Sequence, residues 1–155
     1  GQIALLGKYV RQAIVANQVQ LSLVHHFLIS EGLVANIATN TTVLATGTLD
    51  YCRQNDIQIQ AWGPVANGRL SRPESEVDEA LRPAAALVAQ LAAEKGVSAD
   101  AILLAWLLRH PSGIHPIIGT ARPERITDSA PAVDVALSRE EWYALLAAVR
   151  GKGVP

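Results

Sequence analysis

The most informative stretch of this chain is residues 114–126, which read Ile114-His115-Pro116-Ile117-Ile118-Gly119-Thr120-Ala121-Arg122-Pro123-Glu124-Arg125-Ile126. A short apolar run ends at Gly-Thr, and two arginines follow where a helix is expected to begin. A strand, a tight turn and a helix start in this order can hold a phosphate, because the helix dipole and the free backbone N–H groups favour an anion there. Arg122 and Arg125 add positive charge and bidentate donors. Taken alone, the segment equally allows an ordinary strand-to-helix turn with solvated arginines.

The composition predicts a single folded domain. The chain has 155 residues, of which 50% are hydrophobic and 17% charged, so it can bury a sizeable core and is not disordered. A net charge of −1 gives no reason to expect a nucleic-acid partner. No apolar run reaches the roughly 18 residues of a membrane span, so we expect no membrane partner either. One cysteine, Cys52, cannot form an internal disulfide, which is typical of the cytoplasm.

Strands and helices alternate along the chain. Short apolar runs predict strands near residues 15–23, 57–62 and 114–118. Residues 24–47 are expected to form a loop with one helical turn, and residues 63–75 a surface loop. Helices are predicted over 2–12, 48–55, 83–95, 98–110, from 123 onward, and 138–150. Such alternation implies parallel strands joined by helical crossovers, and therefore an α/β fold.

The final helix has the clearest start and stop signals. Ser138-Arg139-Glu140-Glu141 is a capping box, with the glutamate at the third helical position. An apolar stripe follows and ends at a glycine; it consists of Trp142, Leu145, Leu146 and Val149.

Three parallel strands are too few to stand alone. A parallel sheet is normally covered on both faces, and a closed (β/α)8 barrel takes about 250 residues. The outer strands of this chain would be unpaired edges. The chain also opens on Gly1 and contains no methionine, so we expect a processed or truncated start. Either more chain lies upstream, or the edges are covered by a partner or by self-association.

Three blocks of sequence, residues 17–22, 47–65 and 102–126, resemble the C-terminal half of bacterial aldo-keto reductases. The blocks read Asn-Gln-Val-Gln-Leu-Ser, then Gly-Thr-Leu-Asp-Tyr-Cys through Ala-Trp-Gly-Pro-Val, then Ile-Leu-Leu-Ala-Trp through Ile-Gly-Thr-Ala-Arg-Pro-Glu-Arg-Ile. The resemblance implies a partial TIM barrel, with residues 1–155 as its C-terminal half, the strands as the sixth to eighth, and the last helix packing outside the barrel. It also implies that NADPH binds at the carboxyl ends of the strands and reduces an aldehyde or ketone to an alcohol.

The same resemblance assigns the nicotinamide and pyrophosphate ends of the cofactor site. Gln18 matches the glutamine that hydrogen-bonds the carboxamide, and an amide supplies the donor and the acceptor that this requires. Trp62 matches the aromatic residue that stacks on the nicotinamide ring. Gly63, Pro64 and Val65 would lie under the pyrophosphate, where small residues let the backbone approach. Without the resemblance, Gln18 is an ordinary polar strand residue and Trp62 a core tryptophan.

The adenosine end of the cofactor site falls mainly on residues 114–126. Gly119, Thr120 and Arg125 match positions that bind the 2′-phosphate and the adenosine ribose. Asp128 and Ser129 stand where the family often has an acidic residue and an amide in contact with adenine. Ser129 departs from that pattern, which leaves the adenine contact in doubt.

No residue of this chain matches the family's catalytic tyrosine, lysine, aspartate or histidine. We therefore expect no catalytic residue here, although the parent family consists of enzymes. Nor do we expect a metal site, because His25 and His26 point in different directions and have no third ligand nearby. The leading hypothesis is a segment of an NADPH-dependent oxidoreductase that acts on a carbonyl substrate. The alternative is a catalytically inactive half-barrel that serves as a nucleotide-binding, structural or oligomerisation module.

Overall fold

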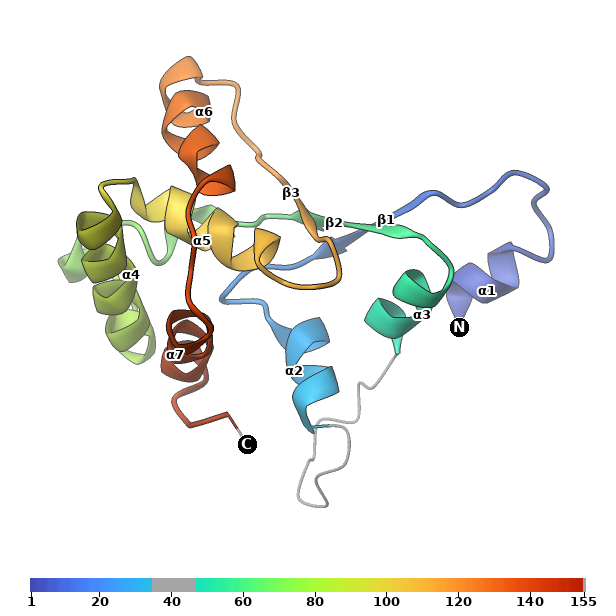
Figure 1. The fold of residues 1–155 in the computed structure, drawn as a ribbon, viewed down its shortest axis with the longest axis horizontal. Helices are drawn as coiled ribbons and strands as arrows, with labels where there is room; N and C mark the ends of the chain where they lie inside the picture. Colours follow the sequence, from blue (N-terminus) through green and yellow to red (C-terminus); the bar gives the residue numbers. More distant parts are fainter. Residues whose placement is uncertain (35–46, 155) are drawn as a thin grey trace.

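The computed structural model describes residues 1–34 and 47–154, which form a parallel sheet flanked by helices (Figure 1). The strands β1 (Ala16–Gln20), β2 (Gln58–Trp62) and β3 (His115–Ile117) lie side by side in chain order. Both pairings are parallel, and the register places Gln20, Trp62 and Ile117 in one row. The predicted arrangement of three parallel strands with flanking helices is confirmed, although each strand is shorter than its predicted range.

Helices connect and follow the strands at nearly all of the predicted places. They are α1 (Gln2–Leu6), α2 (Phe27–Val34), α3 (Thr48–Gln54), α4 (Arg82–Lys95), α5 (Ala99–Leu108), α6 (Pro123–Ser129) and α7 (Arg139–Arg150). Short 3-10 turns occur at Ala66–Gly68, Glu74–Glu76, Glu79–Leu81 and Ala130–Val133.

Two helices differ clearly from their predictions. α1 ends at Leu6 instead of continuing to residue 12, and none of its residues is buried, so no packing supports a longer helix. In the other case a loop with a single helical turn was predicted, but α2 is a helix of eight residues. Leu28 and Ile29 of α2 are buried in the core, which explains why this polar-flanked stretch is helical. Residues 35–46 of the predicted loop lie outside the described residues.

The two faces of the sheet differ. On β2, Ile59 and Ala61 are buried against the helices, whereas Gln58 and Trp62 are exposed. The exposed face is polar at the start of the strands: Gln58 and His115 lie 3.2 Å apart, between Nε2 and Nε2. At the ends of the strands this face is apolar, because Trp62 and Ile117 remain 46% and 40% exposed.

The core lies between the sheet and α4, α5 and α7. Residues 101–107 of α5 are all buried, as expected for a helix that is apolar nearly all round. Trp106 of α5 stacks on Trp142 of α7, with ring centroids 4.9 Å apart and planes inclined by 9°. This pair holds the last helix against the central one.

α7 begins with the predicted capping box. The Glu141 N–H donates to Ser138 Oγ at 3.1 Å, and the Ser138 N–H donates to Glu141 Oε2 at 2.6 Å. Lys95 at the end of α4 pairs with Glu141 at 2.8 Å. The cap therefore fixes the start of α7 and also ties α7 to α4.

The segment after β2 is held in an unusual backbone conformation. Ala66, Asn67 and Gly68 have φ angles of 48°, 56° and 74°, all in the left-handed region. The guanidinium of Arg72 donates to the carbonyls of Asn67 and Gly68, at 3.0 and 3.3 Å. These hydrogen bonds hold the turn in place, although its two non-glycine residues, Ala66 and Asn67, have a strained backbone.

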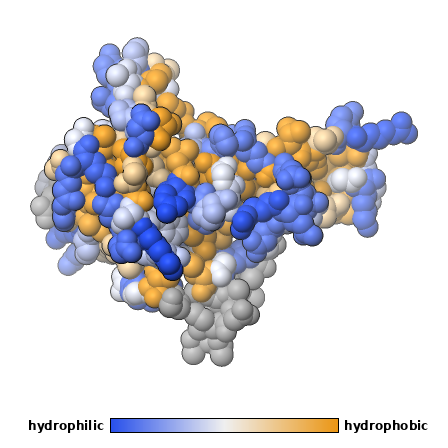
Figure 2. Space-filling model, viewed as in Figure 1, coloured by the Kyte–Doolittle hydropathy of each residue, from blue (hydrophilic) through white to orange (hydrophobic). Residues whose placement is uncertain are grey.

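The N-terminal residues 1–15 form an arm that extends away from the helical body (Figure 1). Hydrophobic side chains show among hydrophilic ones along this arm (Figure 2). Leu5, Leu6, Tyr9 and Val15 are 56%, 50%, 80% and 72% exposed. An arm with this much apolar surface has the character of a segment that packs against something else.

Candidate functional site

A cavity of about 270 Å³ opens where β2 and β3 end and where α5 begins. It is lined by Gly63, Pro64, Val65, Asn67, Asp100, Ile118, Gly119, Thr120, Arg125 and Ser129. The carboxyl ends of parallel strands meet at one edge of a sheet, so the segments that follow β2 and β3 come together here although they are about 55 residues apart in sequence. Most of the residues predicted to bind a cofactor share this cavity.

Two glycines leave space for a ligand beside the backbone. Gly63 has a φ angle of 63°, which favours glycine because other residues are strained there. A Cβ atom added at Gly63 or at Gly119 would meet no other atom within 4 Å. Both backbones therefore face open space at the edge of the cavity.

Arg125 supplies positive charge to the cavity. Its Nη2 donates to Asp100 Oδ2 at 3.3 Å, and its side chain is still 49% exposed. A guanidinium has five N–H donors, so most of them stay available to a ligand. In contrast, Arg122 is not among the lining residues, and its backbone N–H donates to Thr120 Oγ1 at 3.2 Å. α6 has only seven residues, so we assign the attraction for an anion to Arg125 and not to the helix dipole.

One carboxylate oxygen of Asp100 lacks a hydrogen-bond donor within the described part of the chain. This atom, Oδ1, is buried. Buried polar atoms are nearly always paired, so this oxygen has room for one more donor, from water or from a bound group. A ligand with a hydroxyl for Asp100 and a phosphate for Arg125 would satisfy both residues.

Three predicted residues lie outside this cavity. Gln18 Nε2 donates to Gln60 Oε1 on the neighbouring strand at 3.3 Å, on the exposed face of the sheet. Trp62 immediately precedes Gly63, and its exposed ring lies at the same end of the sheet. Asp128 lies on α6, where its backbone carbonyl accepts from Ser98 Oγ at 2.8 Å.

Ser129 does line the cavity, but its hydroxyl is already engaged. Ser129 Oγ donates to the carbonyl of Arg125 at 2.7 Å, one helical turn earlier. This bond favours a structural role for Ser129 in α6 and leaves the adenine contact as a prediction.

Sequence reasoning missed Asn67, Asp100 and Ile118. Asp100 had a usable signal, because it stands in the first turn of α5, and helices between parallel strands begin at the carboxyl edge of the sheet. Asn67 had no such signal, since its position depends on the left-handed turn that follows Val65.

The histidine pair is engaged in local contacts. His25 Nδ1 lies 3.1 Å from Ser22 Oγ, and His26 Nδ1 lies 2.7 Å from Ser30 Oγ. Burial, together with the nearby Arg150, lowers the pKa of His26. Across residues 1–34 and 47–154, no three His, Cys, Asp or Glu side chains are grouped closely enough to hold a metal ion. Nor does this part of the chain contain a helix long and apolar enough to cross a membrane.

The chain matches the model of the aldo/keto reductase family over residues 2–150, and it belongs to that family. It is 39% identical over 109 residues to a 6-dehydroglucose reductase of Novosphingobium aromaticivorans, which covers 70% of this chain and 35% of that protein. It is 30% identical over 155 residues to the uncharacterized oxidoreductase YcsN of Bacillus subtilis, covering 99% of this chain and 46% of YcsN. The chain thus spans less than half the length of these relatives.

Solved structures show the same fold. The thermostable aldo-keto reductase Tm1743 superimposes with a TM-score of 0.63 at 20% identity, over 91% of this chain and 42% of that one. A mutant of Gox0644 in complex with NADPH gives a TM-score of 0.59 at 14% identity, over 91% of this chain and 40% of that one. The three parallel strands and their helices therefore correspond to part of an aldo-keto reductase barrel.

Proposed function

We propose that residues 1–155 are the C-terminal half of an aldo-keto reductase barrel, with α7 as the extra helix that packs outside it. The protein would reduce aldehydes or ketones to alcohols with NADPH, and this segment would carry much of the cofactor site. The observation that carries the proposal is the cavity at the carboxyl ends of β2 and β3, where Arg125 and the unpaired oxygen of Asp100 flank two glycines. The lone buried Cys52 is in keeping with a cytoplasmic protein.

The cavity residues divide between the two phosphate regions of the cofactor. Gly63, Pro64 and Val65 would let the pyrophosphate approach the backbone after β2. Gly119, Thr120 and Arg125 would bind the 2′-phosphate and the ribose after β3. A 2′-phosphate carries up to two negative charges at neutral pH, and an arginine matches it in charge and in geometry. Asp128 and Ser129 stay candidates for the adenine contact.

Gln18 and Trp62 would hold the nicotinamide end. The exposed indole of Trp62 offers a flat apolar surface for one face of the ring, and Gln18 offers an amide for the carboxamide. When bound, the nicotinamide supplies a hydride to the carbonyl carbon. Trp62 and Gln18 would determine which face of the ring is free to react.

The proton for the product alcohol must come from outside this set of residues. Tyr9 lies on the exposed N-terminal arm, Tyr51 on α3, and Tyr143 on α7. None of these tyrosines lines the cavity beside Arg125. Because the alkoxide formed by hydride transfer needs a positioned acid, we propose that the isolated 155 residues do not turn over.

The test is NADPH oxidation in the presence of 4-nitrobenzaldehyde, with the whole protein and with the isolated 155 residues. The whole protein should consume NADPH, and Trp62→Ala should slow it, while the isolated segment should bind NADPH weakly without oxidising it. The proposal would be contradicted if the isolated segment oxidised NADPH and a single change to Phe at Tyr9, Tyr51 or Tyr143 abolished that activity. The catalytic acid would then lie in this segment. Binding without turnover in the whole protein as well would favour the alternative of a nucleotide-binding half-barrel.

A further inference from the structure

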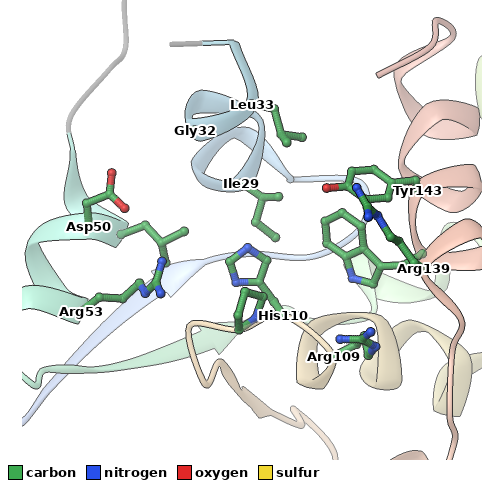
Figure 3. A pocket seen from close by; sticks show the side chains of 12 residues that line it. Ile29, Gly32, Leu33, Asp50, Arg53, Arg109, His110, Arg139 and Tyr143 are labelled. Carbon is green, nitrogen blue, oxygen red and sulfur yellow. The ribbon is translucent and has the colours of Figure 1, made fainter. Parts of the chain in front are cut away.

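A second cavity, of about 360 Å³, lies at the opposite end of α5 from the first (Figure 3). Its walls come from α2, from α3, from the turn that follows α5, and from the first turns of α7. Asp100, at the start of α5, lines the first cavity, whereas Arg109 and His110, just after its end, line the second. α5 has ten residues, so the two cavities are separated by about 15 Å along the helix.

The charged groups of this cavity are mainly arginines. Arg53, Arg109 and Arg139 all line it, and Asp50 is the one acidic residue among the described lining residues. Figure 3 shows Arg53 on one side of the cavity and Arg139 on the other, lying across Tyr143. The Arg139 guanidinium carbon is 5.8 Å from the centre of the Tyr143 ring. Within residues 1–34 and 47–154, neither Arg53 nor Arg139 takes part in an ion pair.

His110 lies between these arginines and has a defined hydrogen-bonding role. The N–H of Ser112 donates to His110 Nδ1 at 3.2 Å, so in the neutral ring the proton is on Nε2. Burial, and then the charge of Arg53, lower the pKa of His110, which favours the neutral ring. His110 therefore adds an N–H donor to the cavity without adding a further charge.

The rest of the cavity is apolar. Ile29 and Leu33 of α2 and Leu49 of α3 form one wall, and the ring of Trp142 belongs to the wall formed by α7. Ile29 and Trp142 are 3% and 8% exposed, so this wall belongs to the folded core and is already in place before a ligand arrives. A preformed apolar wall with a few convergent polar groups is the usual construction of a small-molecule site.

We propose that this second cavity binds a small carboxylate with an apolar body, at a site distinct from the cofactor site. Carboxylates match the planar donor pair of arginine, and Arg53 and Arg139, on opposite sides of the cavity, have no ion pair within the described part of the chain. The wall of Ile29, Leu33 and Trp142 would cover the apolar body and remove it from water. A cavity of about 360 Å³ falls at the lower end of the range for such sites, which selects a small molecule over a peptide.

The probe for this site is 4-phenylbutyrate, with the neutral 4-phenylbutyramide as its matched control. Both are titrated into the protein at low salt, followed by calorimetry and by tryptophan fluorescence. The carboxylate should bind about a hundredfold more tightly than the amide, about tenfold for each of two charge-assisted hydrogen bonds. Arg53→Gln and Arg139→Gln should each weaken the carboxylate about tenfold and leave the amide unchanged. Arg82→Gln, which alters an exposed arginine on α4, should change neither.

Three results would overturn the proposal. One is equal affinity for the acid and the amide, or no binding of either at about 10 mM. Another is a loss of binding in Arg82→Gln as large as in Arg53→Gln. The third is competition by NADPH, which would place the carboxylate in the first cavity. Raising the salt concentration provides a test that needs no variant. It should weaken binding of the carboxylate and leave binding of the amide unchanged. None of these measurements depends on whether the protein reduces carbonyls.

Discussion

Trp106 and Trp142 donate to each other: each indole N–H bonds to the backbone carbonyl of the other residue, at 3.1 and 2.9 Å. Their rings are stacked, and the two residues are 0% and 8% exposed. Buried indole N–H groups need an acceptor, and here each tryptophan supplies the acceptor for its partner. The pair joins α5 to α7 by two hydrogen bonds and one aromatic contact across 36 residues of chain.

We expect Trp142→Phe to lower the free energy of unfolding by about 2 kcal/mol. The substitution keeps an aromatic ring but leaves the Trp106 carbonyl without its donor in a buried place. The measurement is urea unfolding followed by far-ultraviolet circular dichroism. Trp62→Phe is the control, since Trp62 is largely exposed and should change stability by less than about 0.5 kcal/mol. Equal effects at the two positions would show that the reciprocal hydrogen bonds contribute little.

Arg125→Ala should weaken NADPH binding by about 1.5–3 kcal/mol, the range for hydrogen bonds to charged groups. NADH binding should hardly change, because NADH lacks the 2′-phosphate. Calorimetric titration of both cofactors into the whole protein measures the difference. An equal loss for NADPH and NADH would mean that Arg125 supports the fold through its contact with Asp100.

Stability should fall as the pH drops from about 7.5 to 5.5. The pKa of His26 and that of His110 are both lowered in the folded state, chiefly by burial. The unfolded chain therefore binds protons at a higher pH than the folded chain, so stability is lost as the pH falls through the ordinary histidine pKa of about 6.5. The melting temperature measured at several pH values reports this loss. His110→Gln should flatten the profile, and an unchanged profile would contradict the assignment to His110.

Ser138→Ala should destabilise the protein by about 1 kcal/mol through loss of the cap on α7. The effect should be nearly the same in acid, because the Glu141 N–H donates to Ser138 Oγ whatever the charge of the Glu141 carboxylate. Acid should instead weaken the protein and the variant alike. Lys95, and then the Ser138 N–H, hold the pKa of Glu141 below its ordinary value, and the stability that this provides is lost once Glu141 is protonated. Chemical unfolding at pH 7 and at pH 3 compares the two conditions. Ser75→Ala, at an exposed serine outside the helices α1–α7, is the control and should be neutral.

The isolated 155 residues should self-associate or bind the rest of the barrel. β1 and β3 are the outer strands of the described sheet, and the face that carries Trp62 and Ile117 is exposed. Light scattering coupled to size exclusion gives the mass in solution. A well-folded monomer of 16.5 kDa would contradict this prediction.

Local sequence signals were sufficient to predict the ends of helices and strands where the residues at those ends have a single structural role. The capping box at Ser138 and the strand that ends at Trp62, just before Gly63, were both predicted close to their observed places. α2 was missed because its helicity depends on the burial of Leu28 and Ile29, and Gly32 within it weakens the local helical signal. Tertiary packing decided this segment, and no local pattern carries that information.

Several residues that line the first cavity were grouped by the sequence, whereas those of the second cavity were not, and the cofactor role of the first group stays a prediction. Gly119, Thr120 and Arg125 lie together in sequence, so one motif was enough to group them. Asp100 joins them only because α5 starts at the same edge of the sheet. The second cavity unites Arg53, His110 and Arg139 from three distant segments, and none of these segments has a motif of its own.

The order of the strands in the sheet affects how this segment can fold during synthesis. In the described sheet β2 pairs with β1 and β3 with β2, so the strands can be added in the order in which a ribosome releases them. No strand has to wait for a later one to be inserted between two earlier neighbours. Synthesis from the N-terminus would therefore always present a growing edge to the next strand, and any chain made before β1 could serve as its template.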